Sequence, residues 1–301
     1  MQLETSIVCL NLRPAEEPAA RAAAESLWDV GACSDVGRVR QNNEDSFLTA
    51  PEMNLYVLSD GMGGLACGEV ASRLTVDTIM AHCRAADADP SLGLVGRQIA
   101  GATTTSNHLV KAIRLANQVV FQASYEKTTH QGMGATAVAV RCVDQRMSVA
   151  HVGDSRAYRL RDGRLEQLTQ DHSFVAELVR QGTVSERDAD LGNLQNVLTR
   201  AVGTTPEVEV DIREEVFRDG DTVLLCSDGL TRELSDYQIA GILRDADNSQ
   251  EAANQLVGLA NEAGGGDNIT AIVIRQVSSG PGAFWGVGRL SRWFSRCGNR
   301  S

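Results

Sequence analysis

The sequence predicts an α+β fold in which antiparallel β-sheets are flanked by helices. Two observations support this fold class. Short apolar runs typical of buried strands recur along the 301 residues, and several of them end beside an Asp-Gly or Gly-Asp pair. Blocks with the spacing of amphipathic helices lie between these runs. Since both kinds of element need an apolar partner, their alternation favours packed layers of sheets and helices.

The predicted strands are continuously apolar or rich in Val and Ile, as expected for sheets that are covered on both faces. In chain order they lie at residues 56–59, 135–140, 147–152, 222–227 and 269–274. Continuous rather than alternating hydrophobicity indicates that neither face of these strands meets water. The strands are therefore expected in the interior of the fold.

Helical periodicity predicts five helices. In the first two, residues 69–83 and residues 109–120, apolar residues recur on one side. The later helices are predicted at residues 173–181, 236–243 and 250–262. Three consecutive glycines at 264–266 end the last helix, because glycine adopts the backbone conformations that terminate helices.

Composition divides the chain into three parts. Residues 1–27, an N-terminal extension, contain two prolines and no strand pattern. Residues 28–277 hold the strand and helix blocks and are predicted to form the folded domain, with a polar flap at 172–200. Residues 278–301 form a basic aromatic tail that could lie on an anionic membrane surface or dock into a partner. The alternatives are a frayed tail or a tail packed on its own domain.

The charge of the chain argues against nucleic acid as a main partner. The formal net charge is −11, and the tail contributes four arginines and no acids, so the remaining residues carry −15. Binding to phosphate backbones requires clustered Lys and Arg instead. An acidic body of this kind is compatible with a cation-binding site.

Composition also predicts the compartment and the state of the cysteines. Hydrophobic residues make up 43% and charged residues 22% of the chain, which excludes a disordered or fibrous protein. No run of 18 apolar residues and no signal-peptide pattern occurs, so we expect a cytoplasmic location. A monomer is expected as well. The seven cysteines lack CxxC spacing, which favours free buried thiols over zinc sites or disulfides.

Four aspartates stand beside glycine at the ends or starts of predicted strands: Asp60, Asp154, Asp228 and Asp267. A single Asp-Gly pair after a strand is more often a turn than a ligand, because both residues tolerate turn conformations. Four such pairs on rigid strands can instead direct their carboxylates to one point. Converging carboxylates repel one another unless a cation lies between them. Oxygen donors without paired His or Cys favour Mg²⁺ or Mn²⁺ over zinc.

A second charged cluster precedes the first predicted strand and contains Arg40, Glu44 and Asp45. On its own this cluster would be interpreted as an ordinary solvated charge run. Beside a carboxylate metal site, Arg40 is instead a candidate for binding a phosphoryl group, because arginine is the preferred bidentate partner of such a group. Glu44 and Asp45 could then accept hydrogen bonds from waters on the metal.

Eight short motifs occur in order between residues 33 and 274. They are SDVGxxRxxNEDS at 34–46, DGMGG at 60–64, MGAT at 133–136, GDSRAY at 153–158, QDHS at 170–173, LTRAVG at 198–203, SDGLT at 227–231 and GDNIT at 266–270. Together they resemble the bacterial metal-dependent serine/threonine protein phosphatases of the PPM, or type 2C, class. The resemblance implies a four-layer α-β-β-α sandwich, with two central antiparallel sheets flanked by helices and a two-metal centre at one end.

The resemblance also implies metal ligands at matching positions. Asp60 would bridge two Mn²⁺ or Mg²⁺ ions. Asp228 and Asp267 would complete the coordination of the first ion, and the backbone carbonyl of Gly61 would bind the second. Asp154, together with Asp228, would hold a third, weaker ion.

The remaining matches would act around these ions. Glu44 and Asp45 would hold the metals through water. Arg40 would bind the substrate phosphate. The residues carried over as catalytic are Arg40, Asp60 and Asp228.

The implied activity is hydrolysis of phosphoserine and phosphothreonine esters by a metal-activated water, without a covalent enzyme intermediate. The implied partners are phosphorylated proteins, and the implied role is opposition to a bacterial Ser/Thr kinase. Activity on small phosphate esters or phosphorylated regulators at the same centre is an alternative.

One position departs from the family pattern. Bacterial members usually have His after DGMGG, where this chain has Leu65. A histidine there is suited to protonate the leaving alkoxide, so its loss would require water or another residue such as His172. General acid catalysis is typically worth about 10²–10⁴-fold, so turnover could be attenuated. The alternative function is therefore a phospho-recognition or regulatory module that keeps the fold and the metals.

Overall fold

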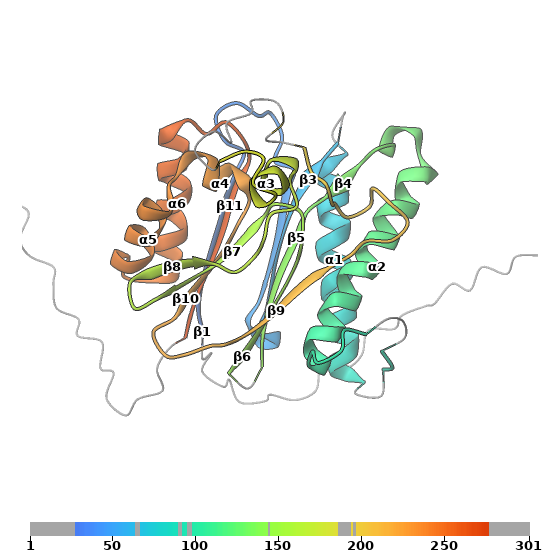
Figure 1. Ribbon diagram of the computed structural model, residues 1–301, viewed down its shortest axis with the longest axis horizontal. Helices are drawn as coiled ribbons and strands as arrows, with labels where there is room; N and C mark the ends of the chain where they lie inside the picture. Colours follow the sequence, from blue (N-terminus) through green and yellow to red (C-terminus); the bar gives the residue numbers. More distant parts are fainter. Residues whose placement is uncertain are drawn as a thin grey trace, which may run out of the picture.

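Two antiparallel β-sheets face each other and are covered by helices on their outer faces, which gives four layers (Figure 1). The computed structural model describes residues 28–63, 67–89, 92–94, 98–143, 145–185, 194 and 197–276. The sandwich predicted from the sequence is confirmed. The N-terminal extension 1–27, Leu65, part of the flap and the tail 278–301 lie outside the described residues.

The sheets are built from neighbouring antiparallel strands. From edge to edge, the first sheet contains β1 (Trp28–Asp35), β11 (Ile269–Gln276), β10 (Thr222–Cys226), β7 (Arg156–Arg161) and β8 (Arg164–Gln167). The second sheet contains β2 (Asp45–Ala50), β3 (Leu55–Met62), β5 (Ala137–Val143), β6 (Arg146–Val152) and β9 (Asp211–Val216). A short strand, β4 (Gly134–Ala135), pairs with the end of β3.

Helices cover the outer face of each sheet. The helices are α1 (Gly68–Ala88), α2 (Thr104–Glu126), α4 (Asp228–Glu233), α5 (Asp236–Asp245) and α6 (Ser249–Ala263), and a further short helix, α3 (Phe174–Arg180), lies in the flap. The long helices α1 and α2 pack on the second sheet, and α5 and α6 pack on the first (Figure 1). A capping box formed by Ser235 and Gln238 starts α5, and Gly264 ends α6 as predicted.

Alternate residues of a central strand face different cores, which explains why these strands are apolar without interruption. In β3, Leu55 and Val57 pack with residues of α1 and α2. Tyr56 and Leu58, which alternate with them along the strand, pack between the two sheets. Strand β10 alternates in the same way, and its Leu225 lies in the core between the sheets.

Each strand and helix predicted from periodicity is present in the structure. The patterns did not predict α4 or the strands β1, β2, β7, β8 and β9. In β7, β8 and β9 the reason is their charge, since these strands carry Arg and Glu at many positions. Hydropathy therefore favours solvated loops where the structure has strands at or next to a sheet edge.

The charged residues of these strands join the two sheets. Arg159 of β7 pairs with Glu166 of β8 at 2.6 Å and with Glu215 of β9 at 2.9 Å. Arg213 of β9 contacts the same two glutamates at 2.7 Å and 2.6 Å. Because β8 belongs to the first sheet and β9 to the second, this ion-pair network closes one edge of the sandwich.

The described cysteines form no disulfide with one another, as the sequence predicts. Four of them are buried: Cys67, Cys83, Cys142 and Cys226. Burial raises the pKa of Cys142 and Cys226 to about 12, so both thiols stay protonated at neutral pH. In the described part of the chain, no helix combines the length and the hydropathy required to span a bilayer.

Replacement of Leu225 tests the core between the sheets. Leu225→Ala is expected to lower the free energy of unfolding by about 2–5 kcal/mol, because it leaves a cavity between two rigid sheets. Urea unfolding followed by circular dichroism measures this change. Leu259→Ala on α6, where the side chain is 40% exposed, is the control and should cost about 1 kcal/mol or less. Equal losses in the two variants would contradict the assigned core.

Candidate metal centre

The predicted site residues converge on one cavity of about 170 Å³ at an end of the sandwich. Seven of the eight predicted residues line it: Arg40, Glu44, Asp60, Gly61, Asp154, Asp228 and Asp267. The eighth, Asp45, is buried and is absent from the lining. The structure therefore brings together acids that are separated by more than 200 positions in the sequence.

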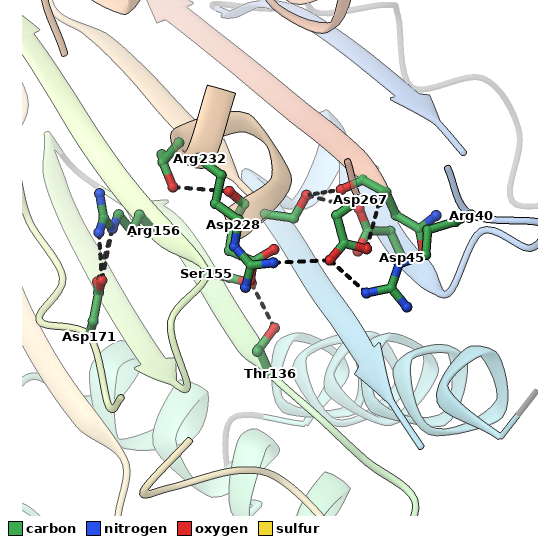
Figure 2. Close-up of polar contacts among 12 residues, drawn as sticks. Arg40, Asp45, Thr136, Ser155, Arg156, Asp171, Asp228, Arg232 and Asp267 are labelled. Carbon is green, nitrogen blue, oxygen red and sulfur yellow. Dashed lines mark hydrogen bonds and ion pairs between the residues drawn. The ribbon is translucent and has the colours of Figure 1, made fainter. Parts of the chain in front are cut away.

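Both sheets contribute acids to this cavity (Figure 2). Asp60 lies near the end of β3 in the second sheet, and Asp154 lies in the turn that connects β6 to β7. Asp228 is the first residue of α4, directly after β10, and Asp267 lies just before β11. Antiparallel pairing places the end of β10 beside the start of β11, so these two acids meet.

The hydroxyl of Thr136 fixes the position of Asp60. The backbone N–H of Asp60 donates to Thr136 Oγ1 at 2.8 Å, and the N–H of Thr136 donates to the Asp60 carbonyl at 2.8 Å. Thr136 Oγ1 also lies 2.7 Å from Ser155 Oγ, next to Asp154 (Figure 2). Gly153 has φ +102°, a backbone conformation that favours glycine, and it lies so close to Thr136 that a Cβ would not fit. Thr136 therefore links the segments that carry two of the acids.

Gly61 allows β3 to approach α1 and the segment before β2. A Cβ at Gly61 would lie 2.1 Å from the carbonyl oxygen of Gly68. The N–H of Gly61 donates to the carbonyl of Glu44 at 3.1 Å, and the N–H of Glu44 donates to Asn268 Oδ1 at 2.8 Å. Burial raises the pKa of the Glu44 carboxyl. The main chain thus holds Glu44 between the two sheets.

Asp45 lies behind the cavity and joins the two sheets. It is the first residue of β2, and its Oδ2 accepts hydrogen bonds from Thr270 at 2.6 Å and Ser227 at 2.9 Å. Burial raises the pKa of Asp45 to about 7. Its other carboxylate oxygen is buried and has no hydrogen-bond partner. An unpaired buried oxygen of this kind fits a centre that a bound cation completes.

Two arginines supply positive charge beside the acids. Arg40 contacts Asp267 Oδ2 at 2.9 Å. Arg232 contacts the same oxygen at 3.2 Å and also pairs with Asp228 (Figure 2). Burial raises the pKa of Asp228, and the Arg232 guanidinium opposes this shift. Among the described residues, the second carboxylate oxygen of Asp228 has no hydrogen-bond partner, like that of Asp45, and both oxygens are buried.

Crowding raises the pKa of the other enclosed acids as well. Burial, followed by repulsion from Asp45 and Asp228, raises the pKa of Asp60 well above its ordinary value. Burial and repulsion from Asp228 raise the pKa of Asp154 to about 7. Carboxyl groups in such a cluster resist simultaneous ionisation unless a counter-charge is bound among them.

The donor set fits divalent metal ions. The six carboxylates of the site outnumber its two guanidiniums, so the site keeps a strong net negative charge when all are ionised, and divalent cations can neutralise it. Carboxylate and carbonyl oxygens are the ligands of Mg²⁺ and Mn²⁺. The two unpaired buried oxygens described above point to the same conclusion.

A histidine pair lies near this centre but does not line the cavity. His151 and His172 stack with ring centroids 4.7 Å apart, and Asp211 lies beside them. Arg200 donates to Asp211 at 2.6 Å and lies 3.0 Å from His172 Nε2, so the Arg200 guanidinium already supplies positive charge to this cluster. His172 Nδ1 accepts from the N–H of Gly153 at 3.1 Å. His172 is thus not placed to act as the general acid considered from the sequence.

The predicted flap at 172–200 borders the cavity where it is described. Leu198, near its end, lines the cavity. A second groove of about 660 Å³ runs along α3 and shares Asp154, Asp228 and Arg232 with the cavity. The flap helix therefore flanks a continuous depression that begins at the acids.

Several cavity-lining residues have no role predicted from the sequence, among them Thr136, Arg232 and Asn268. Thr136 and Asn268 stand inside recognised motifs, but the motifs do not reveal which backbone groups their side chains bind. Arg232 follows Asp228 by four residues, a spacing that pairs side chains on a helix. In the sequence, the Asp-Gly pair at 228–229 suggests a loop turn rather than the start of a helix. The pairing of Arg232 with Asp228 was therefore not predicted.

Comparison with known proteins identifies the family. The family model described as Protein phosphatase 2C matches residues 37–263. The chain is 35% identical over 246 residues to serine/threonine phosphatase stp of Listeria monocytogenes serotype 4b (strain F2365), covering 81% of this chain and 94% of that protein. The chain belongs to the protein phosphatase 2C family, as the order of its motifs predicts.

Solved structures agree with this assignment. The Mycobacterium tuberculosis serine/threonine phosphatase PstP/Ppp matches with a TM-score of 0.71 and 36% identity, covering 82% of this chain and 98% of that chain. The catalytic domain of PstP in complex with two manganese ions matches with a TM-score of 0.71 and 35% identity, covering 83% and 99%. The predicted PPM-type sandwich is thereby confirmed.

Replacement of Thr136 tests the scaffold of the acids. Thr136→Val preserves side-chain volume but removes the acceptor for the Asp60 N–H, so the free energy of unfolding should fall by about 1–3 kcal/mol. Urea unfolding of the metal-free protein measures the loss. Thr128→Val, at an exposed position, is the matched control and should change this free energy by about 0.5 kcal/mol at most. A Thr136 variant as stable as the control would show that the hydroxyl does not hold Asp60.

Proposed function

We propose that the chain is a metal-dependent protein phosphatase that hydrolyses phosphoserine and phosphothreonine at this cavity. The observation that carries the proposal is the convergence of acids from both sheets beside the half-exposed Arg40. Membership of the protein phosphatase 2C family supports the class of reaction. The relative PstP, solved in complex with two manganese ions, supports a dinuclear centre.

The acids would hold two ions, Mn²⁺ or Mg²⁺, between the sheets. Asp60 and the carbonyl of Gly61 would bind from the second sheet, and Asp228 and Asp267 from the first. Asp154 would contribute to a third, weaker site. When bound, such ions supply an activated water as nucleophile and neutralise charge on the phosphoryl group.

Two further acids would support the ions from outside. The hydrogen bond from the Glu44 N–H to Asn268 fixes the main chain at this residue. Glu44 lines the cavity, where its carboxylate would accept hydrogen bonds from water. Asp45 is tied to Ser227 and Thr270, and these bonds would keep the two halves of the centre at a constant separation. Positioned acceptors of this kind orient the groups that react.

Arg40 is the residue that would bind the substrate phosphate. Its side chain is 50% exposed at the mouth of the cavity and contacts Asp267 through one nitrogen. A guanidinium has five N–H donors, so Arg40 can keep this contact and still donate to phosphoryl oxygens. The fixed positive charge would stabilise negative charge on those oxygens during transfer.

Phosphorylated bacterial proteins are the proposed substrates, and the proposed role is to oppose a bacterial Ser/Thr kinase. The bacterial serine/threonine phosphatases among the relatives support this role. Variation in the flap at 172–200 would set the choice of substrate. Docking of the tail, residues 278–301, to a membrane or partner stays a prediction.

A second candidate function is phospho-recognition without turnover. The observation in its favour is Leu65, where bacterial family members usually have His. A module of this kind would bind Mn²⁺ and a phosphothreonine peptide and release no phosphate. Catalytic measurements therefore separate the two candidates.

Removal of one central carboxylate tests the proposed enzyme. Asp60→Asn is expected to lower Mn²⁺-dependent hydrolysis of a phosphothreonine peptide by about 10²-fold or more, because the amide cannot replace the charge that holds the ions. Phosphate release across a Mn²⁺ titration measures the effect, and excess chelator should abolish the wild-type activity. A small aryl phosphate assayed in parallel tests the alternative substrate class.

The matched control is Asp77→Asn, an exposed position on α1 paired only with Arg73 among described residues. This variant should keep the wild-type rate. Full activity of Asp60→Asn, or a wild-type rate unaffected by chelator, would overturn the proposed centre. Binding of Mn²⁺ and peptide by the wild type without phosphate release would favour the recognition module.

Replacement of Arg40 tests phosphate binding. Arg40→Gln is expected to lower kcat/KM for the phosphothreonine peptide about 10–100-fold, the loss of a charge-assisted hydrogen bond worth about 1.5–3 kcal/mol. Steady-state kinetics at saturating Mn²⁺ measure it. Arg38→Gln, an exposed arginine two residues earlier, should leave kcat/KM nearly unchanged. Equal effects of both changes would reduce the role of Arg40 to general surface charge.

A further inference from the structure

Arg232 occupies the position between two acids that the proposed metal ions require. It lies one helical turn after Asp228 on α4, and its guanidinium pairs with the Oδ2 atom of that residue. A second nitrogen of the same guanidinium lies 3.2 Å from Asp267 Oδ2 (Figure 2). Arg232 therefore bridges two carboxylates from separate segments of the first sheet.

Arg232 binds Oδ2 of each acid, which leaves the buried Oδ1 of Asp228 without a hydrogen-bond partner among the described residues. The other oxygen of Asp267, Oδ1, already accepts a hydrogen bond from the N–H of Asn268 at 2.9 Å. Oδ2 of Asp267 is shared by two guanidiniums, those of Arg40 at 2.9 Å and Arg232 at 3.2 Å. A guanidinium that bridges two carboxylates and a divalent cation that joins the same two would compete for one position and repel each other at short range. Contact of the ion with this pair of acids therefore excludes Arg232 from it.

Arg40 is placed differently from Arg232. It contacts only Asp267 among the acids, from the loop between β1 and β2, and its side chain is 50% exposed. The Arg232 side chain is 32% exposed and contacts two acids. Its bridge compensates the repulsion between Asp228 and Asp267, which the contact of Arg40 with one acid cannot do.

We propose that Arg232 is an exchangeable counter-ion of the metal centre. In the metal-free protein it neutralises Asp228 and Asp267, and metal ions must displace it in order to bind. Arg232 thereby sets the metal concentration at which the centre fills. This inference rests on the metal centre of the proposed function and concerns the regulation of that centre.

The structure provides space for the displaced side chain. Arg232 lines both the cavity of about 170 Å³ and the adjoining groove of about 660 Å³. In this groove, Asp171 is already bound by Arg156 through three nitrogen–oxygen contacts of 2.7–3.0 Å, so it does not compete strongly for a second guanidinium. Rotation into the groove would keep the arginine solvated while freeing both acids.

The exchange predicts opposite effects of one substitution with and without metal. Arg232→Gln removes the internal positive charge, so the dissociation constant for Mn²⁺ should fall on the order of tenfold. The thermal midpoint of the metal-free protein should fall by a few degrees, because two neighbouring carboxylates lose their counter-ion. The shift of the midpoint on adding Mn²⁺ should be larger than in the wild type.

The test is calorimetric titration of Mn²⁺ into the full chain, with thermal unfolding in chelator and in Mn²⁺. Arg232→Lys keeps the charge and should bind Mn²⁺ with nearly the wild-type dissociation constant. The control is Arg244→Gln on α5, which removes the same charge from an exposed arginine paired with Asp245. It should change neither the dissociation constant nor the shift of the midpoint.

The outcomes separate this inference from the function on which it rests. Tighter Mn²⁺ binding by Arg232→Gln alone supports the exchange. Equal dissociation constants in the wild type, Arg232→Gln and Arg244→Gln would overturn it and leave the metal centre intact. No Mn²⁺ binding by any of these proteins would overturn both. Binding without phosphate release would remove the enzymatic function but not the exchange.

Discussion

Repulsion among buried carboxylates is the constraint on which this structure depends. Six acids meet at one end of the sandwich, and burial raises the pKa of those that are most enclosed, among them Asp45 and Asp60. Hydrogen bonds from the backbone N–H groups of Asp60 and Glu44 to the side chains of Thr136 and Asn268 fix the segments that carry the acids. Only a bound counter-charge lets so many carboxylates ionise together at this distance, and such a centre provides the chemistry proposed above.

The same constraint connects the site to the stability of the fold. Asp60 belongs to one sheet, whereas Asp228 and Asp267 belong to the segments that flank strands of the other. The core between the sheets aligns these acids, and a cation held by them would tie the sheets together in turn. Asp45 adds a direct link, because it starts β2 and binds Thr270 of β11. Packing and function therefore depend on one another at this end of the molecule.

Much of this arrangement could be predicted from the sequence. Apolar runs identify β3 and β10 because both faces of these strands are buried, and the acids beside them follow from their positions. The charged strands β7 and β9 could not be found in this way, since Arg159 and Glu215 are paired across the sheets rather than solvated. Arg232 escaped notice because its role depends on α4, a six-residue helix that starts with an Asp-Gly pair. Pairing in space, rather than local pattern, determines these features.

The central claim is that the carboxylate cavity binds divalent metal between the two sheets. A crystal structure of the chain grown with Mn²⁺, with anomalous diffraction data, tests it most directly. The account predicts anomalous peaks in the cavity, in contact with Asp60, Asp228 and Asp267. Empty density there, with manganese instead beside His151 and His172 or bound nowhere, would contradict it.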